Sequence, residues 1–143
     1  TDDHNIKILE VGGRLGGEMI NSHLIPLAQP GISPYEILIE VAQGRSPLSE
    51  QDYTEKFTSQ AASRIIVPPK TGKITSVEGI EKLYSSPYYR YFVQQYGAGD
   101  EMVGSDVKYR SNEIGYLIAQ CSESDDMDQV LLGLVDNIKV EMD

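Results

Sequence analysis

A turn near the start of the chain combines a carboxylate, a guanidinium and four glycines between residues 10 and 17. Glu10 and Arg14 lie four positions apart, at the end of a largely apolar segment over residues 6–11 that is typical of a strand. A carboxylate can bind Mg²⁺, which prefers oxygen ligands and often shares phosphate oxygens. An arginine can donate two parallel hydrogen bonds to phosphate or carboxylate. The glycines let a ligand approach the backbone, so the turn indicates chemistry on a phosphorylated species.

The same residues have a structural alternative, which is an ordinary Glu-Arg ion pair on a tight turn. Glycine-rich turns are a weak signal by themselves, so spacing alone leaves both interpretations open. His23 could serve as a base or hydrogen-bonding group toward an acceptor amine, or be a partly buried side chain of a short helix. Glu18 could contact substrate, or stabilise the start of a helix through its negative charge.

The composition is that of an ordinary globular protein with an acidic surface. The 143 residues are 40% hydrophobic and 24% charged, enough for one domain or two small lobes with a real core. The net charge of -10 argues against nucleic acid or an anionic membrane as a partner. Cys121 is the only cysteine, which excludes an internal disulfide and a multi-thiolate metal site. With no apolar run of membrane-spanning length, we expect a cytoplasmic protein.

Helix and strand patterns change near residue 60, where we expect a boundary between two pieces, residues 1–60 and 61–143. In the first piece, residues 19–28 are weakly helical, and Ser33 followed by Pro34 predicts a helix that ends at Gly44. The second piece is predicted as a compact α+β lobe. It contains these elements: a β-hairpin or meander of strands 62–69 and 70–77, a short helix or turn within 77–87, a strand over 88–96, a loop over 97–104, a strand over 114–122, and a helix over 127–138 capped by Ser122 and Asp125.

Two segments, "KILEVGGRLGG" and "GISPYEILIEVAQG", resemble the end of an ATP-grasp domain. That superfamily typically has Glu-x-Asn-x-Arg-x-Gly-Gly, a helix, Gly-(Ile/Val)-(Asp/Ser), and a helix that ends in Ala-x-Gly. The family's asparagine, a second metal ligand, is replaced here by Gly12, which leaves open whether there are one or two metal sites. The L-amino-acid-ligase branch of the superfamily often has a small residue at that position, and in this respect the chain resembles that branch. The matching positions are Glu10, Arg14, Gly16, Gly17, Gly31, Ile32, Ser33, Ala42 and Gly44.

The resemblance implies an α+β chain made of the last strand and helices of an ATP-grasp domain, then a small antiparallel β-rich lobe with a C-terminal helix. It implies that Glu10 binds Mg²⁺ and that Arg14 is catalytic, stabilising the transferred phosphoryl group or a substrate carboxylate. Gly16 and Gly17 are implied to line the ATP site together with Glu10 and Arg14. The lobe after residue 60 is similar to the C-terminal lobe of those ligases, more loosely than the first 44 residues.

The implied activity is ATP- and Mg²⁺-dependent joining of a small carboxylate to an amine through an acyl phosphate. The superfamily's phosphate-covering loop and adenine-side lysines have no counterpart in these 143 residues. The resemblance therefore predicts a C-terminal fragment, inactive alone, whose partner is the missing N-terminal part of the same enzyme. A homodimer is a further expectation left open. The alternatives are a carbamoyl-phosphate-synthetase-like or biotin-carboxylase-like enzyme, a non-catalytic anion-binding module, and a lobe that only supports dimerisation.

Overall fold

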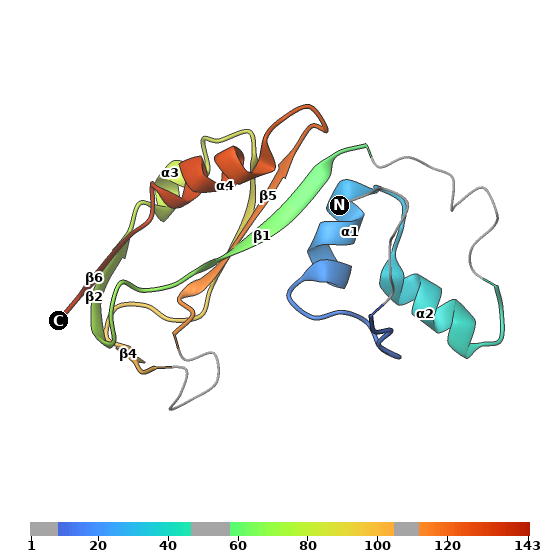
Figure 1. Cartoon of the computed structure of the whole chain (residues 1–143), viewed down its shortest axis with the longest axis horizontal. Helices are drawn as coiled ribbons and strands as arrows, with labels where there is room; N and C mark the ends of the chain where they lie inside the picture. The colour runs from blue at the N-terminus through green and yellow to red at the C-terminus, as the bar shows by residue number, and fades with distance from the viewer. Residues whose placement is uncertain (1–8, 47–57, 105–111) are drawn as a thin grey trace.

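A computed structural model describes residues 9–46, 58–104 and 112–143 (Figure 1). Residues 9–11 have no regular structure, so the predicted strand over residues 6–11 is wrong in this part, and its remainder lies outside the described residues. A strand needs a neighbouring strand to pair its backbone groups, and none of the described strands lies beside residues 9–11. The π-helix η1 (Ile20–Leu24) then continues into α1 (Ile25–Ala28), which confirms the predicted helical stretch.

Helix α2 (Pro34–Ala42) begins and ends where the sequence predicts. The Ser33 hydroxyl accepts a hydrogen bond from the backbone N–H of Glu36 at 3.3 Å, which satisfies one of the free donors at the helix start. Past its end, Gly44 has a φ of +75°, a left-handed conformation that glycine adopts without steric cost. The helix lies at the end of the molecule away from β2 and β6 (Figure 1), and several of its apolar side chains are half exposed: Tyr35, Leu38, Ile39 and Val41.

The strands of the described residues after position 58 form two three-stranded antiparallel sheets. Successive strands alternate strictly between the sheets, so no two strands adjacent in sequence pair with each other. The first sheet has the order β1-β5-β3 and contains β1 (Gln60–Ile66), β3 (Tyr89–Gln94) and β5 (Gly115–Cys121). The second has the order β4-β2-β6 and contains β2 (Gly72–Glu78), β4 (Glu101–Met102) and β6 (Lys139–Met142).

The predicted hairpin or meander of strands 62–69 and 70–77 is wrong, although both strands exist. Gln60 to Ile66 pair with Cys121 to Gly115, and β2 pairs with β4 and β6. Pro68 and Pro69 lie between the two strands, and a proline cannot donate a hydrogen bond to a strand ladder. The chain therefore leaves the first sheet at these prolines and enters the second. The predicted loop over residues 97–104 contains the two-residue strand β4, and β6 was not predicted.

Two helices accompany the sheets, α3 (Ile80–Leu83) and α4 (Met127–Val135). Helix α4 packs against β1 and β5 (Figure 1). Its N-cap is Asp126, whose carboxylate accepts from the backbone N–H groups of Asp128 and Gln129 at 3.1 and 3.2 Å. The predicted capping pair, Ser122 and Asp125, forms a turn before the helix instead, with a 2.9 Å bond from the Ser122 N–H to the Asp125 carboxylate.

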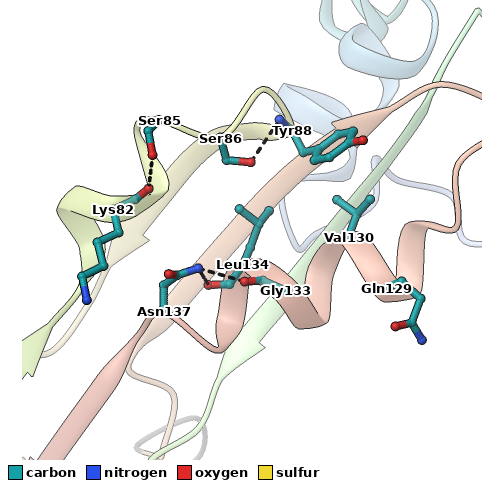
Figure 2. Close-up of a pocket in the computed structure, with 9 residues that line it drawn as sticks. All are labelled: Lys82, Ser85, Ser86, Tyr88, Gln129, Val130, Gly133, Leu134 and Asn137. Carbon is teal, nitrogen blue, oxygen red and sulfur yellow. Dashed lines mark hydrogen bonds between the residues drawn. The ribbon is translucent and has the colours of Figure 1, made fainter.

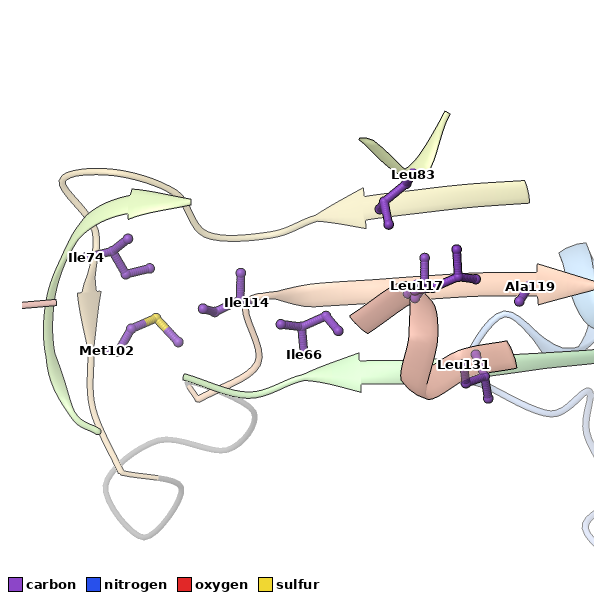
Figure 3. Packing of buried hydrophobic residues seen from close by; sticks show 9 residues of the cluster. Ile66, Ile74, Leu83, Met102, Ile114, Leu117, Ala119 and Leu131 are labelled. Atoms are coloured by element: carbon purple, nitrogen blue, oxygen red, sulfur yellow. The ribbon is translucent and has the colours of Figure 1, made fainter. Parts of the chain in front are cut away.

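One hydrophobic cluster joins both sheets and both of these helices (Figure 3). Strand β5 lies at the centre of its sheet and is buried along almost its whole length. At its end, burial raises the pKa of the Cys121 thiol, and the nearby Asp125 and Asp126 add to the effect. None of the helices in the described part of the chain is long and apolar enough to cross a bilayer. The cluster contains Ile66, Ile74, Leu83, Met102, Ile114, Leu117, Ala119, Leu131 and Leu134.

Candidate functional site

The glycine turn over residues 10–17 lies on the surface, with the side chains of Glu10 and Arg14 exposed. The Arg14 guanidinium donates one hydrogen bond from Nη1 to the carbonyl oxygen of Leu15 at 3.0 Å. Among the described residues an ion pair joins Arg45 to Glu40, and none joins Glu10 to Arg14. The arrangement therefore lacks the internal Glu-Arg pair of the structural alternative and leaves most of the guanidinium fork accessible.

The four glycines of the turn are not required by the packing of the described chain. A Cβ added at Gly12, Gly13 or Gly17 would have no described atom within 4 Å beyond its chain neighbours. At Gly16 it would make ordinary contacts of 3.4 to 3.6 Å with Ile20 and Asn21. None of the four has a positive φ. Since glycine costs backbone entropy, a ligand that approaches the backbone closely would explain these glycines.

The exit from the turn is strained and is tied to the helix that follows. Glu18 and Met19 have φ values of 54° and 62°, a left-handed conformation that costs a residue other than glycine about 1–2 kcal/mol. The buried Asn21 side chain donates from Nδ2 to the carbonyl oxygen of Gly16 at 2.5 Å, which links η1 back to the turn. Strained residues and π-helices both occur often at functional sites.

His23 lies half-buried on η1 and packs against the first sheet. Its ring meets the ring of Tyr91 on β3 edge to face, with 4.8 Å between the centroids. Its Nδ1 lies 2.7 Å from the hydroxyl of Ser22. These contacts agree with the packing role that the sequence left open, and a substrate role for His23 stays a prediction.

The exit from the turn also meets strand β1, which the sequence could not reveal. Glu18 lines an open pocket of about 500 Å³ together with Ser63, Arg64, Ile65 and Val67. Arg64 is exposed and brings a second guanidinium to this side of the molecule, about fifty positions later in the sequence. The alternation of side chains along β1 is the sequence signal that could indicate which face of the sheet Arg64 lies on. Arg64 could not be predicted from the sequence, because only the tertiary fold brings it to the same pocket as Glu18.

A partly buried hydrogen-bond network holds the helical segment after the turn against β5. Gln120 donates from Nε2 to the carbonyl oxygen of Leu27 at 2.6 Å and to the hydroxyl of Ser59 at 2.8 Å. Ser59 in turn donates to the Leu27 carbonyl at 2.9 Å. On the other side of the amide, Arg90 donates from Nε to the Gln120 Oε1 at 2.7 Å. Gln120 therefore connects α1, the residue before β1, and β3 through one side chain.

Replacing Gln120 by alanine should loosen this segment without unfolding the lobe. The substitution removes three hydrogen bonds and leaves the Arg90 Nε–H and the Leu27 carbonyl with fewer partners, at a cost of about 2 kcal/mol. Hydrogen exchange should then accelerate for the amides of residues 20–28 while those of β5 change little. Gln94→Ala, at an exposed position on β3, is the control. Equal protection of residues 20–28 in both variants would contradict the role assigned to Gln120.

The described residues contain no group of three His, Cys, Asp or Glu side chains placed to hold a metal ion. The described residues could therefore add at most one further side chain of these types to Glu10 at a metal. Mg²⁺ usually keeps several waters and binds one or two carboxylates together with substrate phosphates. A single exposed carboxylate beside an open turn fits such a site in part, as one ligand among several.

Comparison with known proteins gives a match in structure only. No protein-family model matches the chain, and no curated protein has a significantly similar sequence. An L-amino acid ligase from Bacillus licheniformis is similar with a TM-score of 0.73 and 16% sequence identity, over 96% of this chain and 33% of the ligase chain. A phosphoribosylglycinamide synthetase from Anaerococcus prevotii is similar with a TM-score of 0.65 and 18% identity, over 92% of this chain and 32% of that chain.

Both neighbours are ATP-grasp enzymes, and the chain spans about a third of the length of each. The similarity at these low identities concerns the fold. The antiparallel sheets with few helices agree with the α+β architecture that the resemblance in the first segments implies. The chain therefore has the fold of part of an ATP-grasp enzyme.

Proposed function

We propose that this chain is part of an ATP- and Mg²⁺-dependent ligase that joins a small carboxylate to an amine through an acyl phosphate. The observation that carries the proposal is the likeness in fold to the L-amino acid ligase, which extends over nearly the whole chain. The exposed turn adds chemical support, because it presents a carboxylate, an accessible guanidinium and glycines that the described packing does not require.

In the proposed enzyme each residue of the turn has a separate role. Glu10 holds Mg²⁺, which when bound neutralises charge on phosphate oxygens. Arg14 donates hydrogen bonds to the transferred phosphoryl group or to the substrate carboxylate, where a guanidinium stabilises developing charge. Gly16 and Gly17 let the nucleotide approach the backbone. Glu18 and His23, further along the chain, contact the substrate in this proposal.

We further propose that additional polypeptide of the same enzyme completes the nucleotide site. Residues 1–60 would then belong to the ATP-grasp domain and residues 61–143 to a separate lobe of a cytoplasmic enzyme. The support is an apolar surface beside the turn, where Leu9 is 97% exposed and Val11 80% exposed. The half-exposed apolar side chains of α2 are further exposed apolar surface on the same piece of the chain. Large exposed apolar surface is typical of an interface.

Turnover by the protein encoded by the complete gene tests the proposal. ADP formation with Mg-ATP should require both a carboxylate and an amine, and removal of Mg²⁺ with EDTA should abolish it. Arg14→Ala should lower kcat/KM at least about a hundredfold, the usual size of a lost donor to developing charge. Glu10→Gln should raise the Mg²⁺ concentration required for half-maximal rate.

The control variant is Arg45→Ala, which removes an exposed guanidinium that pairs with Glu40 at the end of α2. Its rate should equal that of the unaltered protein. Calorimetric titration of the 143-residue chain alone with Mg-ATP should detect no binding. Micromolar binding by the chain alone would contradict the ligase proposal and favour a self-contained anion-binding module.

A further inference from the structure

A second pocket lies in the C-terminal lobe, between α4 and the segment that contains α3 and the turn after it (Figure 2). Its volume is about 450 Å³, within the range of roughly 300–1,000 Å³ that is typical of small-molecule sites. None of the residues that line it comes from residues 9–46. The pocket is therefore built from different elements than the glycine turn, and the proposed function does not use it.

The pocket has an apolar floor and a polar rim. Leu134 is only 4% exposed and forms the floor with the half-buried Val130 and Tyr88. Lys82 and Asn137 lie together at one end of the rim (Figure 2). No Asp or Glu is among the described residues that line the pocket. Although the chain has a net charge of -10, the side chains that line this pocket carry one positive charge, that of Lys82.

The polar groups of the rim keep capacity for a ligand. Asn137 uses its Nδ2 to donate to the carbonyl oxygens of Gly133 and Leu134, at 2.8 and 3.4 Å, and this leaves its Oδ1 as an acceptor. The Ser86 hydroxyl accepts from the N–H of Tyr88 at 3.3 Å and retains its own proton to donate. The ammonium group of Lys82 has no ion-pair partner among the described residues.

Gly133 gives an independent reason to regard the pocket as a site. It lies inside α4, on the face that lines the pocket, where glycine weakens a helix relative to alanine. Its φ is not positive, and an added Cβ would have no described atom within 4 Å. Neither the backbone nor the packing of the described chain therefore requires glycine here. The missing side chain instead keeps the pocket wall open.

We propose that this pocket binds a monocarboxylate with an apolar body. The ligand's carboxylate pairs with the Lys82 ammonium, at the end of the rim where Asn137 also lies (Figure 2). Its apolar body lies on Tyr88, Val130 and Leu134, in the space that the missing side chain of Gly133 leaves. A neutral ligand of the same shape loses the charge pair, and a dianion meets only one positive group.

The test uses 4-phenylbutyrate as the probe, added to the ¹⁵N-labelled chain and followed by amide shifts in NMR. Saturable shifts should be confined to the amides around Tyr88, Gly133 and Asn137. Lys82→Gln should weaken binding about threefold, the size of an exposed charge pair. Gly133→Ala should weaken it at least about fivefold, because the added methyl overfills the site. The same variant should raise Tm by about 3 °C, since alanine is the better helix former.

The opposite signs expected for Gly133→Ala separate a ligand site from a structural glycine. A loss of both stability and binding would overturn the proposal, because it would show that packing requires the glycine. The control for Lys82→Gln is Lys139→Gln, an exposed lysine on β6 outside the pocket, which should bind the probe normally. Equal affinity for 4-phenylbutyramide, or no saturable shift at these amides, would also overturn it.

Discussion

Replacing Gly79 by alanine is expected to lower the free energy of unfolding by at least about 4 kcal/mol, among the largest effects of a single substitution. A Cβ at Gly79 would lie 1.8 Å from the carbonyl oxygen of Asn137 and 2.9 Å from its carbon. Both are backbone atoms between α4 and β6, so relief requires the second sheet to move. The φ of +87° adds strain for any residue other than glycine.

Urea unfolding followed by circular dichroism measures this loss. Gly99→Ala is the matched control, since Gly99 also has a positive φ, of +98°, but an added Cβ there would meet no described atom within 4 Å. It isolates backbone strain from the clash and should cost about 1 kcal/mol. Similar losses for the two variants would mean that Gly79 does not lie against Asn137.

The second large effect is expected from Leu117→Ala, at about 3 kcal/mol. Leu117 is 0% exposed at the centre of β5, and it belongs to the cluster that joins both sheets and helices. Truncating Leu117 leaves a cavity in the cluster against which both sheets and both helices pack. Leu132 on α4 is 46% exposed, and Leu132→Ala should cost under about 1 kcal/mol by the same urea measurement. Comparable losses would contradict the central place of β5.

Features that depend on neighbouring residues were predicted best. Ser33 and Pro34 mark the start of α2, and Gly44 marks its end, because capping and backbone preference act within a few positions. The pairing of strands was not predictable in the same way. Gln60 pairs with Cys121, sixty-one positions away, and no local pattern distinguishes this partner from a nearby strand. The wrong hairpin prediction followed from taking adjacent strands as partners.

In the candidate site too, features that depend on neighbouring residues could be predicted, and features that depend on the tertiary fold could not. Residue types and spacing were enough to single out Glu10 and Arg14, and their catalytic roles stay predictions. The neighbours that surround the segment come from distant parts of the chain, as Arg64 and Gln120 show. The left-handed conformation of Glu18 could not be predicted either, because the residue at this position is not a glycine, which would indicate such a conformation.

The strict alternation of strands between the two sheets has a consequence for how the lobe folds. Each sheet contains every second strand of the lobe. Pairing the strands of one sheet therefore leaves strands of the other sheet in the connecting loops. Each of these pairings loses the entropy of a long loop before its contacts form. The contacts therefore join residues far apart in the sequence, and a high contact order of this kind slows folding. Neither sheet has a contiguous stretch of chain that could nucleate it alone. A nascent chain that has emerged only as far as β4 can pair β2 with β4, but β1 and β3 still lack β5, the strand that lies between them. We therefore expect the lobe to complete its folding only after β5 and β6 have emerged.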